Sequence, residues 1–381
     1  MNTKLLAIIV PQEYKNANHF ELWNCIAESF DGITVIIDIP ADAVVSRIKN
    51  KKYRIDEAKQ NFRKIGEKSY IIRPYFVIRP EICGTLYHSM CAKKIIHTIE
   101  KYFMIQEDNI ALIAYNAFWI CGFVRSNFRG QMTYYLYDEV RMKADTGKID
   151  EKKYKYDEIA CAHADIVLTM TKKIAESRAA LNPNILVIGN GALKPKITTH
   201  QVEKFDNSIA FVGNFRDWID KELFSDLVQK RQDISFFIVG SIENNMKEYL
   251  ESLQSKHSNI SYIGRVKKEE MVNLYKKFDG IIIPYKDNDF IKATRPIKIV
   301  ESVLAGTPVV TIPMDGYTET SFIRFANTID EFSQQIDYLL NNPINMDSDE
   351  YRHFVDDNTW NRKAEVIIEA INRKDKCESI T

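Results

Sequence analysis

Short apolar runs alternate with amphipathic segments along almost the whole chain. The runs 5–10 and 280–284 are continuous and end in polar loops, as expected of strands buried inside a parallel sheet. Between such runs, apolar residues recur at helical spacing, as they do in 87–102. Strands that alternate with helices in this way predict a doubly wound parallel sheet of the α/β class.

The same patterns divide the chain into two series of elements. The strands predicted for the first series are 5–10, 34–39, 69–77, 110–114, 132–136, 166–170 and 185–188, with helices over 19–27, 87–102, 149–163 and 172–181. Those of the second series are 208–212, 234–239, 260–263, 280–284 and 309–312, with helices over 221–230, 246–254, 267–277 and 296–304 and a last helix over 351–371. The polar stretch 194–207 has no apolar period and is the predicted linker, so we expect domains over 1–195 and 206–350, followed by a C-terminal helix over 351–381.

The most informative stretch is TRPIKIVESVLAGTPVV, from Thr294 to Val310. It predicts a helix that begins at Pro296 and follows a buried strand and a polar loop. A helix start offers free N–H groups and a partial positive charge, and Lys298 adds a full one, so this point suits a phosphate. Glu301, one turn further, suits the ribose hydroxyls of a sugar nucleotide. An ordinary surface pair between Lys298 and Glu301 is the competing interpretation.

Strand ends in the second series support a ligand at the same edge. Gly213, Gly240 and Gly264 each follow or end a predicted strand, and ligands of open α/β sheets bind beyond the carboxyl ends of strands. No GxGxxG opens either half, which argues against a dinucleotide cofactor.

The composition narrows the classes of binding partner and the cellular locations that we expect. The 52 Lys and Arg balance 52 Asp and Glu, so net charge does not point to nucleic acid. Six scattered cysteines without a CxxC pair disfavour zinc and disulfides and fit a cytoplasmic protein. The first apolar run is too short for a signal peptide or membrane span. The segment 47–73 has ten basic and three acidic residues with apolar ones between them, which fits either contact with an anionic membrane surface or a solvated helical face.

The second half resembles the bacterial nucleotide-sugar glycosyltransferases of the GT-B fold, group 1, and within them the teichuronic acid and xanthan glucuronosyltransferase-like enzymes. The resemblance rests on FVGNFRDWIDKELFSDLVQKRQDISFFIVGS, NISYIGRVKKEEMVNLYKKFDGIIIPY, PIKIVESVLAGTPVV and NTWNRKAEVI, taken in order. In the first half, HADIVLTMTKKIAE, VIGNGAL and YYLYDEV match more loosely.

This resemblance implies two Rossmann-like domains that face each other across a cleft, an N-terminal one for the acceptor and a C-terminal one for the donor, with the last helix crossing back. It implies a UDP-sugar donor, an oligosaccharide or lipid-linked acceptor of cell-surface polysaccharide synthesis, and no metal or cofactor. A lipid-linked acceptor would place the protein peripherally on the inner face of the cell membrane. The donor-binding residues that it implies are Gly213, Asn214, Arg216, Gly264, Arg265, Tyr285, Thr294, Arg295, Lys298 and Glu301.

One position departs from many retaining relatives. They carry a Glu eight positions before the residue that matches Glu301, where this chain has Ala293. The xanthan-type relatives also lack that Glu and invert the anomeric centre, so we expect an inverting enzyme.

An inverting transferase needs a general base beside the acceptor hydroxyl. Asp138, in the YYLYDEV motif, is the first candidate and Glu139 the second, although Asp138 could instead cap a helix or pair with Arg141. His19, after the first strand, is a third candidate for contact with the acceptor, or a capping and packing residue. Trp119, Tyr134, Tyr135 and Tyr137 are candidates for stacking on sugars, or core residues.

Two other functions fit the same pattern. A non-hydrolysing sugar-nucleotide 2-epimerase would share the two-domain fold. A non-catalytic partner would bind a glycan or nucleotide sugar without turning it over.

Overall fold

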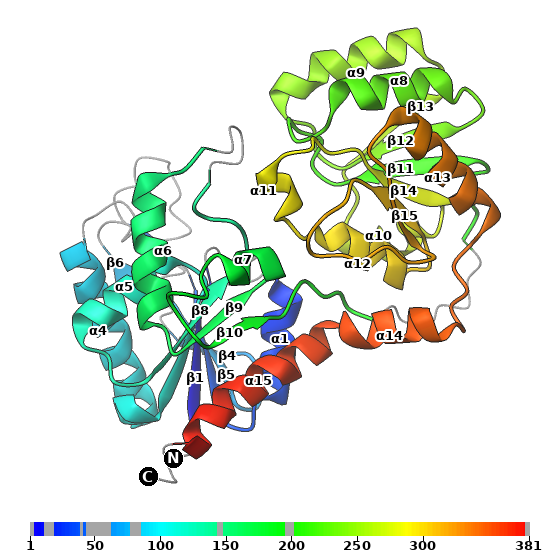
Figure 1. Cartoon of the computed structure of the whole chain (residues 1–381). Coiled ribbons are helices and arrows are strands. Elements are labelled where there is room, and N and C mark those ends of the chain that lie inside the picture. The colour runs from blue at the N-terminus through cyan, green and yellow to red at the C-terminus, as the bar shows by residue number, and fades with distance from the viewer. Residues whose placement is uncertain are drawn as a thin grey trace. The chain divides into compact units, whose positions relative to one another are not determined.

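The computed structural model describes residues 4–10, 19–38, 41–42, 62–76, 85–142, 148–194 and 202–377. These residues form two compact units (Figure 1). Unit 1 comprises Met1–Lys143, Ile149–Ile188 and Trp360–Thr381, and unit 2 comprises Ala144–Lys148 and Gly189–Thr359. Apart from the boundaries of the short stretch Ala144–Lys148, the chain therefore passes from one unit to the other at 188/189 and again at 359/360.

Unit 1 is built on an eight-stranded sheet in the order β10-β9-β8-β7-β1-β2-β5-β4. All neighbours pair in parallel except β4 and β5, which pair antiparallel. The strands of the sheet are β1 (Leu5–Ile9), β2 (Ile33–Ile37), β4 (Phe62–Lys64), β5 (Ser69–Ile72), β7 (Ile110–Ala114), β8 (Gln131–Leu136), β9 (Ile166–Thr169) and β10 (Ile185–Val187), while β3 (Ala41–Asp42) and β6 (Tyr75–Phe76) pair with each other.

Helices cover both faces of this sheet (Figure 1). One face carries α4 (Thr85–Phe103), α5 (Ala117–Ser126) and α6 (Glu151–His163), and the other carries α1 (Phe20–Ser29) and α15 (Trp360–Cys377). The short helices η3 (Glu107–Asn109) and α7 (Lys172–Glu176) complete the described elements of the unit. Because both faces are covered, β1 is buried along its whole length, as its unbroken apolar run requires.

Unit 2 is built on a six-stranded sheet in the order β13-β12-β11-β14-β15-β16, parallel throughout. Its strands are β11 (Ser208–Val212), β12 (Ser235–Val239), β13 (Ile260–Gly264), β14 (Gly280–Ile283), β15 (Val309–Thr311) and β16 (Ile323–Phe325). Its helices are α8 (Lys221–Lys230), α9 (Asn244–Lys256), η4 (Lys268–Glu270), α10 (Met271–Tyr275), α11 (Asp289–Lys292), α12 (Ile297–Leu304), α13 (Ile329–Asn341) and α14 (Asp349–Asp357).

The doubly wound parallel sheets predicted from the sequence are confirmed in both units. In unit 2 the chain runs outward from β11 through β12 to β13 and then returns to the other side of β11 with β14. The carboxyl ends of β11 and β14 therefore mark the point at which the strand order reverses, where ligands of open α/β sheets bind.

The predicted single last helix over 351–371 is wrong. The structure has two helices, α14 and α15, separated by Asn358 and Thr359. Asn358 ends α14, because its side-chain amide donates to Phe354 O and its carbonyl accepts from Ala192 N at 2.9 Å. Thr359 forms an isolated parallel bridge with Ala192, which takes the backbone out of the helix.

Other differences are elements that the apolar pattern did not reveal. These are α5, α11, β16 and α13. Most of the basic segment 47–73 lies outside the described residues, and its described end forms β4 and β5 rather than a helix. Half of the predicted linker, 195–201, also lies outside them.

Candidate active site

Lys298 lies in the first turn of α12, close to the carboxyl ends of β11 and β14. Its Nζ donates a hydrogen bond to the Tyr285 hydroxyl at 2.9 Å and lies 4.6 Å from the centre of the Phe211 ring. The side chain is partly buried, and no carboxylate among the described residues forms an ion pair with it. A partly buried cation without a counter-ion, at a helix start, is suited to bind an anion.

Glycine at position 213 leaves room for this ammonium group. Gly213 has φ +140°, and a Cβ there would lie 2.4 Å from Lys298 Nζ. Gly240 packs directly against it, because a Cβ on Gly240 would lie 1.9 Å from Gly213 O. Gly240 N in turn donates to Gly264 O at 2.8 Å. Three of the predicted residues, Gly213, Gly264 and Lys298, thus lie along one sheet edge.

Glu301 does not pair with Lys298. Its Oε2 accepts a hydrogen bond from the Tyr275 hydroxyl at 3.1 Å, and the side chain is partly buried. The competing interpretation, a surface pair between Lys298 and Glu301, is therefore wrong. Burial, followed by the charge of Glu301, raises the pKa of Tyr275 far above its usual value, so this hydroxyl stays protonated and can continue to donate.

The loop after β11 forms its own polar cluster. Arg216 pairs with Glu243 at 3.2 Å and stacks over Trp218 at 4.2 Å. Asn214 accepts a hydrogen bond from Ser241 Oγ at 2.9 Å. Arg265, beyond β13, is exposed. Arg216 is thus neutralised by an ion pair with Glu243, whereas Lys298 forms no ion pair among the described residues.

Two residues before α12 make contacts within unit 2. Thr294 Oγ1 donates to Ile291 O at 2.7 Å and so closes the end of α11. Arg295 Nη2 donates to Asn358 Oδ1 at 2.7 Å, and its guanidinium lies 5.0 Å from the centre of the Tyr317 ring. Ala293, at the position of the absent glutamate, is buried.

In unit 1, the two adjacent carboxylates after β8 have opposite surroundings. Asp138 accepts a hydrogen bond from Glu139 N at 2.9 Å, and Arg141 pairs with Asp157 instead of with Asp138. Desolvation by burial raises the pKa of Asp138 from 3.8 to about 6, against the opposing hydrogen bond from Glu139 N. A carboxyl group with such a pKa can accept a proton near neutral pH.

Glu139 belongs to a buried network of charges. Both of its oxygens accept from Arg178, at 2.5 and 2.6 Å, and Arg178 also reaches Asp157 at 3.1 Å. Arg141 pairs with Asp157 at 2.6 Å, so two carboxylates face two guanidinium groups. Because both oxygens of Glu139 are occupied by one arginine, this carboxylate is poorly placed to contact an acceptor hydroxyl.

His19 is packed between aromatic residues. It has left-handed backbone angles before α1, and its Nδ1 shares a hydrogen bond with the Tyr135 hydroxyl at 2.7 Å. Its ring also lies 5.2 Å from the ring of Trp360. Tyr134, Tyr135 and Trp119 are buried core residues, so the expectation that they stack on sugars is wrong, whereas Tyr137 is partly buried and stacks on Tyr115 at 4.1 Å.

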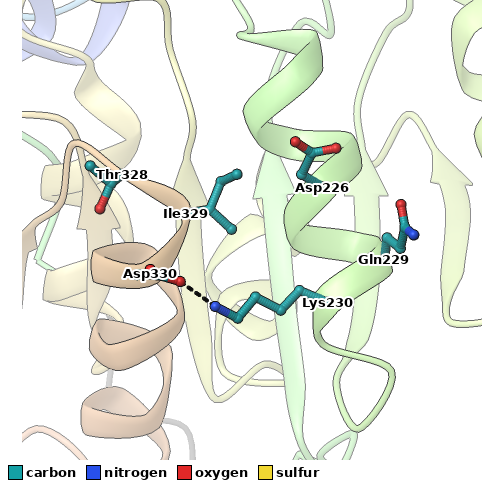
Figure 2. A pocket seen from close by; sticks show the side chains of 6 residues that line it. All are labelled: Asp226, Gln229, Lys230, Thr328, Ile329 and Asp330. Carbon is teal, nitrogen blue, oxygen red and sulfur yellow. Dashed lines mark hydrogen bonds and ion pairs between the residues drawn. The ribbon is translucent and has the colours of Figure 1, made fainter.

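A separate hollow lies on unit 2 between α8 and the start of α13 (Figure 2). Lys230 pairs with Asp330 across it, and both side chains are largely exposed. None of the predicted site residues lines this hollow. Its one lysine is paired with Asp330, and Asp226 adds a second carboxylate, so the hollow does not offer a free positive charge to an anion.

Comparison with known proteins gives a match in unit 2. Residues 206–342 match the family model described as glycosyl transferases group 1. No curated protein matches the chain in sequence. Solved structures match it over nearly its whole length. Sucrose-phosphate synthase from Thermosynechococcus elongatus has a TM-score of 0.61 at 12% identity and covers 99% of this chain and 98% of its own.

Two further structures give the same result. α,α-Trehalose-phosphate synthase (UDP-forming) from Burkholderia xenovorans has a TM-score of 0.64 at 9% identity, covering 97% of this chain and 100% of its own. HepE from Anabaena, in complex with UDP and glucose, has a TM-score of 0.56 at 14% identity and covers 99% of both chains. The chain has the GT-B fold. Its assignment to the teichuronic acid and xanthan glucuronosyltransferase-like group stays a prediction.

Each unit of this GT-B protein contains residues near the candidate side chains that the sequence patterns did not reveal. Phe211 lies on β11 and reads as a core residue, yet its ring contacts Lys298. Tyr275 lies on α10 and holds Glu301. Asp157 and Arg178 lie far apart in sequence and meet only in the folded unit. Within the described residues, no group of His, Cys, Asp or Glu side chains is arranged to hold a metal ion. No helix among these residues is long and apolar enough to span a membrane.

Proposed function

We propose that the protein is a glycosyltransferase that moves a sugar from a nucleotide diphosphate donor, a UDP-sugar, to a glycan or lipid-linked acceptor. The observation that supports this most strongly is Lys298, a partly buried cation at the start of α12 that has no carboxylate partner within the described part of the chain. The group 1 match over 206–342 covers this residue and its surroundings.

In this proposal Lys298 and the first N–H groups of α12 bind the diphosphate. As the glycosidic bond breaks, negative charge grows on the departing UDP, and fixed positive groups lower the energy of that state. Glu301, oriented by Tyr275, binds the ribose hydroxyls. Gly213, Asn214 and Arg216 form the phosphate loop, Gly264 and Arg265 lie beside the base, and Tyr285 positions Lys298.

Asp138 is the proposed base. It accepts the proton of the acceptor hydroxyl while that oxygen attacks the anomeric carbon, which inverts its configuration. Its raised pKa favours this role over Glu139, whose oxygens are both occupied by Arg178. His19 is proposed to support the wall of the acceptor site rather than to transfer protons.

The test is an incubation of the protein with UDP-sugars in the presence and absence of short glycan acceptors. A transferase releases UDP and forms a new glycoside only when acceptor is present. An epimerase would convert the donor into a second sugar nucleotide without acceptor. Donor binding without turnover on any acceptor would favour the non-catalytic function.

We also propose that the protein contacts the inner face of the cell membrane through 47–73. At the described end of this segment, Phe62 and Ile65 are exposed next to Arg63 and Lys64. Apolar and basic side chains together favour anionic bilayers. Vesicles with phosphatidylglycerol should sediment the protein and those with phosphatidylcholine alone should not. Equal sedimentation, or none, would contradict the proposal.

A further inference from the structure

Two of the places where the chain passes between the units, at 188/189 and at 359/360, are connected by hydrogen bonds inside unit 2. Ala192, just after the first passage, donates its N–H to Asn358 O at 2.9 Å and forms a bridge with Thr359. Asn358 and Thr359 come just before the second passage. We refer to residues 189–192 and 358–359 as the two crossovers.

Arg295 contacts both crossovers. Its Nη2 donates to Asn358 Oδ1 at 2.7 Å, and its backbone carbonyl accepts from the side-chain amide of Asn190. Asn190 is buried, so this hydrogen bond is shielded from water. Arg295 thus contacts one segment that lies 105 positions before it in the sequence and another that lies 63 positions after it.

The packing around Arg295 leaves its side chain little freedom. A Cβ on Gly189, which has φ +66°, would lie 2.0 Å from Arg295 Nη1. A Cβ on Gly316 would lie 2.9 Å from its Cγ. Tyr317 lies under the guanidinium and its hydroxyl donates to Pro296 O at 2.8 Å. A movement of Arg295 must therefore be accompanied by movement of these neighbours.

Arg295 also lies at the beginning of the proposed nucleotide site. It directly precedes Pro296, the N-cap of α12, and Lys298 is three residues further along. The same backbone that presents the first N–H groups of α12 therefore carries the hydrogen bond to Asn190. Arg295 therefore couples the conformation of the start of α12 to that of the crossovers.

We propose that Arg295 is a positioning residue that connects the nucleotide site to both crossovers, without touching the nucleotide itself. Binding of UDP at α12 then orders residues 189–192 and 358–359 through Arg295. This inference rests on the proposed function for the identity of the ligand. It replaces the expectation from the family resemblance that Arg295 binds the donor.

Amide hydrogen exchange with and without UDP tests the inference on the full chain. In the wild type, UDP should slow exchange around Lys298 and also at both crossovers. In Arg295→Ala, UDP should still bind, with its Kd changed by less than about fivefold, and still slow exchange at Lys298. The effect at the crossovers should disappear. Arg295→Lys, which can still donate to Asn358, should restore part of it.

Arg324→Ala is the matched control. Arg324 is also a partly buried arginine of unit 2, stacked on Tyr338 and hydrogen-bonded to Gln335. Its loss should leave the effect of UDP on the crossovers unchanged. If Arg295→Ala does not fold, Asn190→Ala removes the hydrogen bond to the Arg295 carbonyl and should weaken the effect at 189–192.

The outcomes separate the inference from the proposed function. If UDP does not bind the wild type, the nucleotide assignment fails. If UDP binds and protects Lys298 but leaves the crossovers unchanged, only the inference fails. It also fails if Arg295→Ala keeps the full effect at the crossovers, or if a folded Arg295→Ala loses UDP binding altogether, since Arg295 would then contact the nucleotide.

Discussion

At the scale of single residues, charge is placed in two contrasting ways. Glu139, Arg178, Asp157 and Arg141 neutralise one another in the interior of unit 1. Lys298 has no such partner among the described residues, and Asp138 is desolvated without an arginine beside it. Charges that are costly to keep unpaired are commonly retained for function.

Replacing Asp138 should separate activity from stability. Burial raises the pKa of Asp138 in the folded protein from 3.8 to about 6. The free energy of unfolding is therefore highest below pH 3.8 and falls as the pH rises to about 6. Asp138→Asn has no such loss and should be more stable than wild type at pH 7, by about 1–3 kcal/mol. Denaturant unfolding at pH 4 and pH 7 measures this difference, which should nearly vanish at the lower pH.

The same variant tests catalysis. Wild-type kcat/KM should rise with pH up to about 6 and then level off, since the base must be ionised. Asp138→Asn should lose at least about a hundredfold in turnover, within the range for a general base. Full activity in this variant would remove Asp138 from the mechanism.

Arg178→Met should destabilise unit 1 strongly. It leaves Glu139 and Asp157 buried with one arginine fewer, a change that costs about 3–5 kcal/mol. Urea denaturation measures it. Arg129→Met, which removes an exposed arginine paired with Glu107 and Asp108, is the control and should change the free energy of unfolding by less than about 1 kcal/mol. Equal effects would contradict the assignment of a buried network.

Lys298→Ala should slow sugar transfer by about a hundredfold or more, because one fixed charge on the departing diphosphate is lost. Steady-state kinetics with a UDP-sugar measures this. Lys292→Ala removes a nearby lysine that pairs with Asp287 and should leave turnover within about twofold of wild type. If both variants turn over at the wild-type rate, the diphosphate is bound elsewhere.

At the scale of elements, the site depends on a strand, a loop and a helix start that the sequence predicted well. The strand at 280–284 was recognisable because its apolar run is unbroken. The helix was recognisable because its apolar residues recur at helical spacing between Pro296 and Gly306. The α5 segment, AFWICGFVRS, was missed because apolar residues lie on nearly all its sides, so no helical period stands out. The break between α14 and α15 was missed, because Asn358 ends α14 through a hydrogen bond with Ala192, which is distant in sequence.

Gly213→Ala tests how closely β11 and α12 approach. The new Cβ would meet Lys298 Nζ, and φ of +140° is unfavourable for alanine, so Lys298 must move. We expect UDP to bind about tenfold or more weakly, while the melting temperature falls by only a few degrees. Isothermal titration calorimetry and a thermal melt measure the two effects. Gly66→Ala, at an exposed glycine of unit 1, should leave UDP affinity unaltered.

At the scale of the whole molecule, two doubly wound units were predictable from alternating patterns alone. The candidate donor residues stay a prediction, which rests on the family motifs between residues 208 and 312. The contacts of these residues were not predictable from the sequence, since Tyr275 and Phe211 lie on elements distant in sequence from Glu301 and Lys298. The same holds in unit 1 for Arg178, which binds Glu139 and Asp157. Unit 1 matches the family motifs only loosely, and part of its chain lies outside the described residues.

Removal of divalent metals should not affect the reaction. In the proposed mechanism, Lys298 and the start of α12 neutralise the diphosphate, so EDTA should leave the initial rate within about twofold of that with Mg²⁺. Rates measured after EDTA treatment and after Mg²⁺ is added back test this. A rate that falls to background with EDTA and returns with Mg²⁺ would contradict a metal-independent transferase.

A structure of the protein in complex with UDP tests the proposed nucleotide site most directly. We expect the diphosphate oxygens to lie within hydrogen-bond distance of Lys298 Nζ and of the first N–H groups of α12, and a ribose hydroxyl to lie on Glu301. A nucleotide bound away from α12, or a Lys298 that keeps only its contacts with Tyr285 and Phe211 while UDP is present, would contradict it.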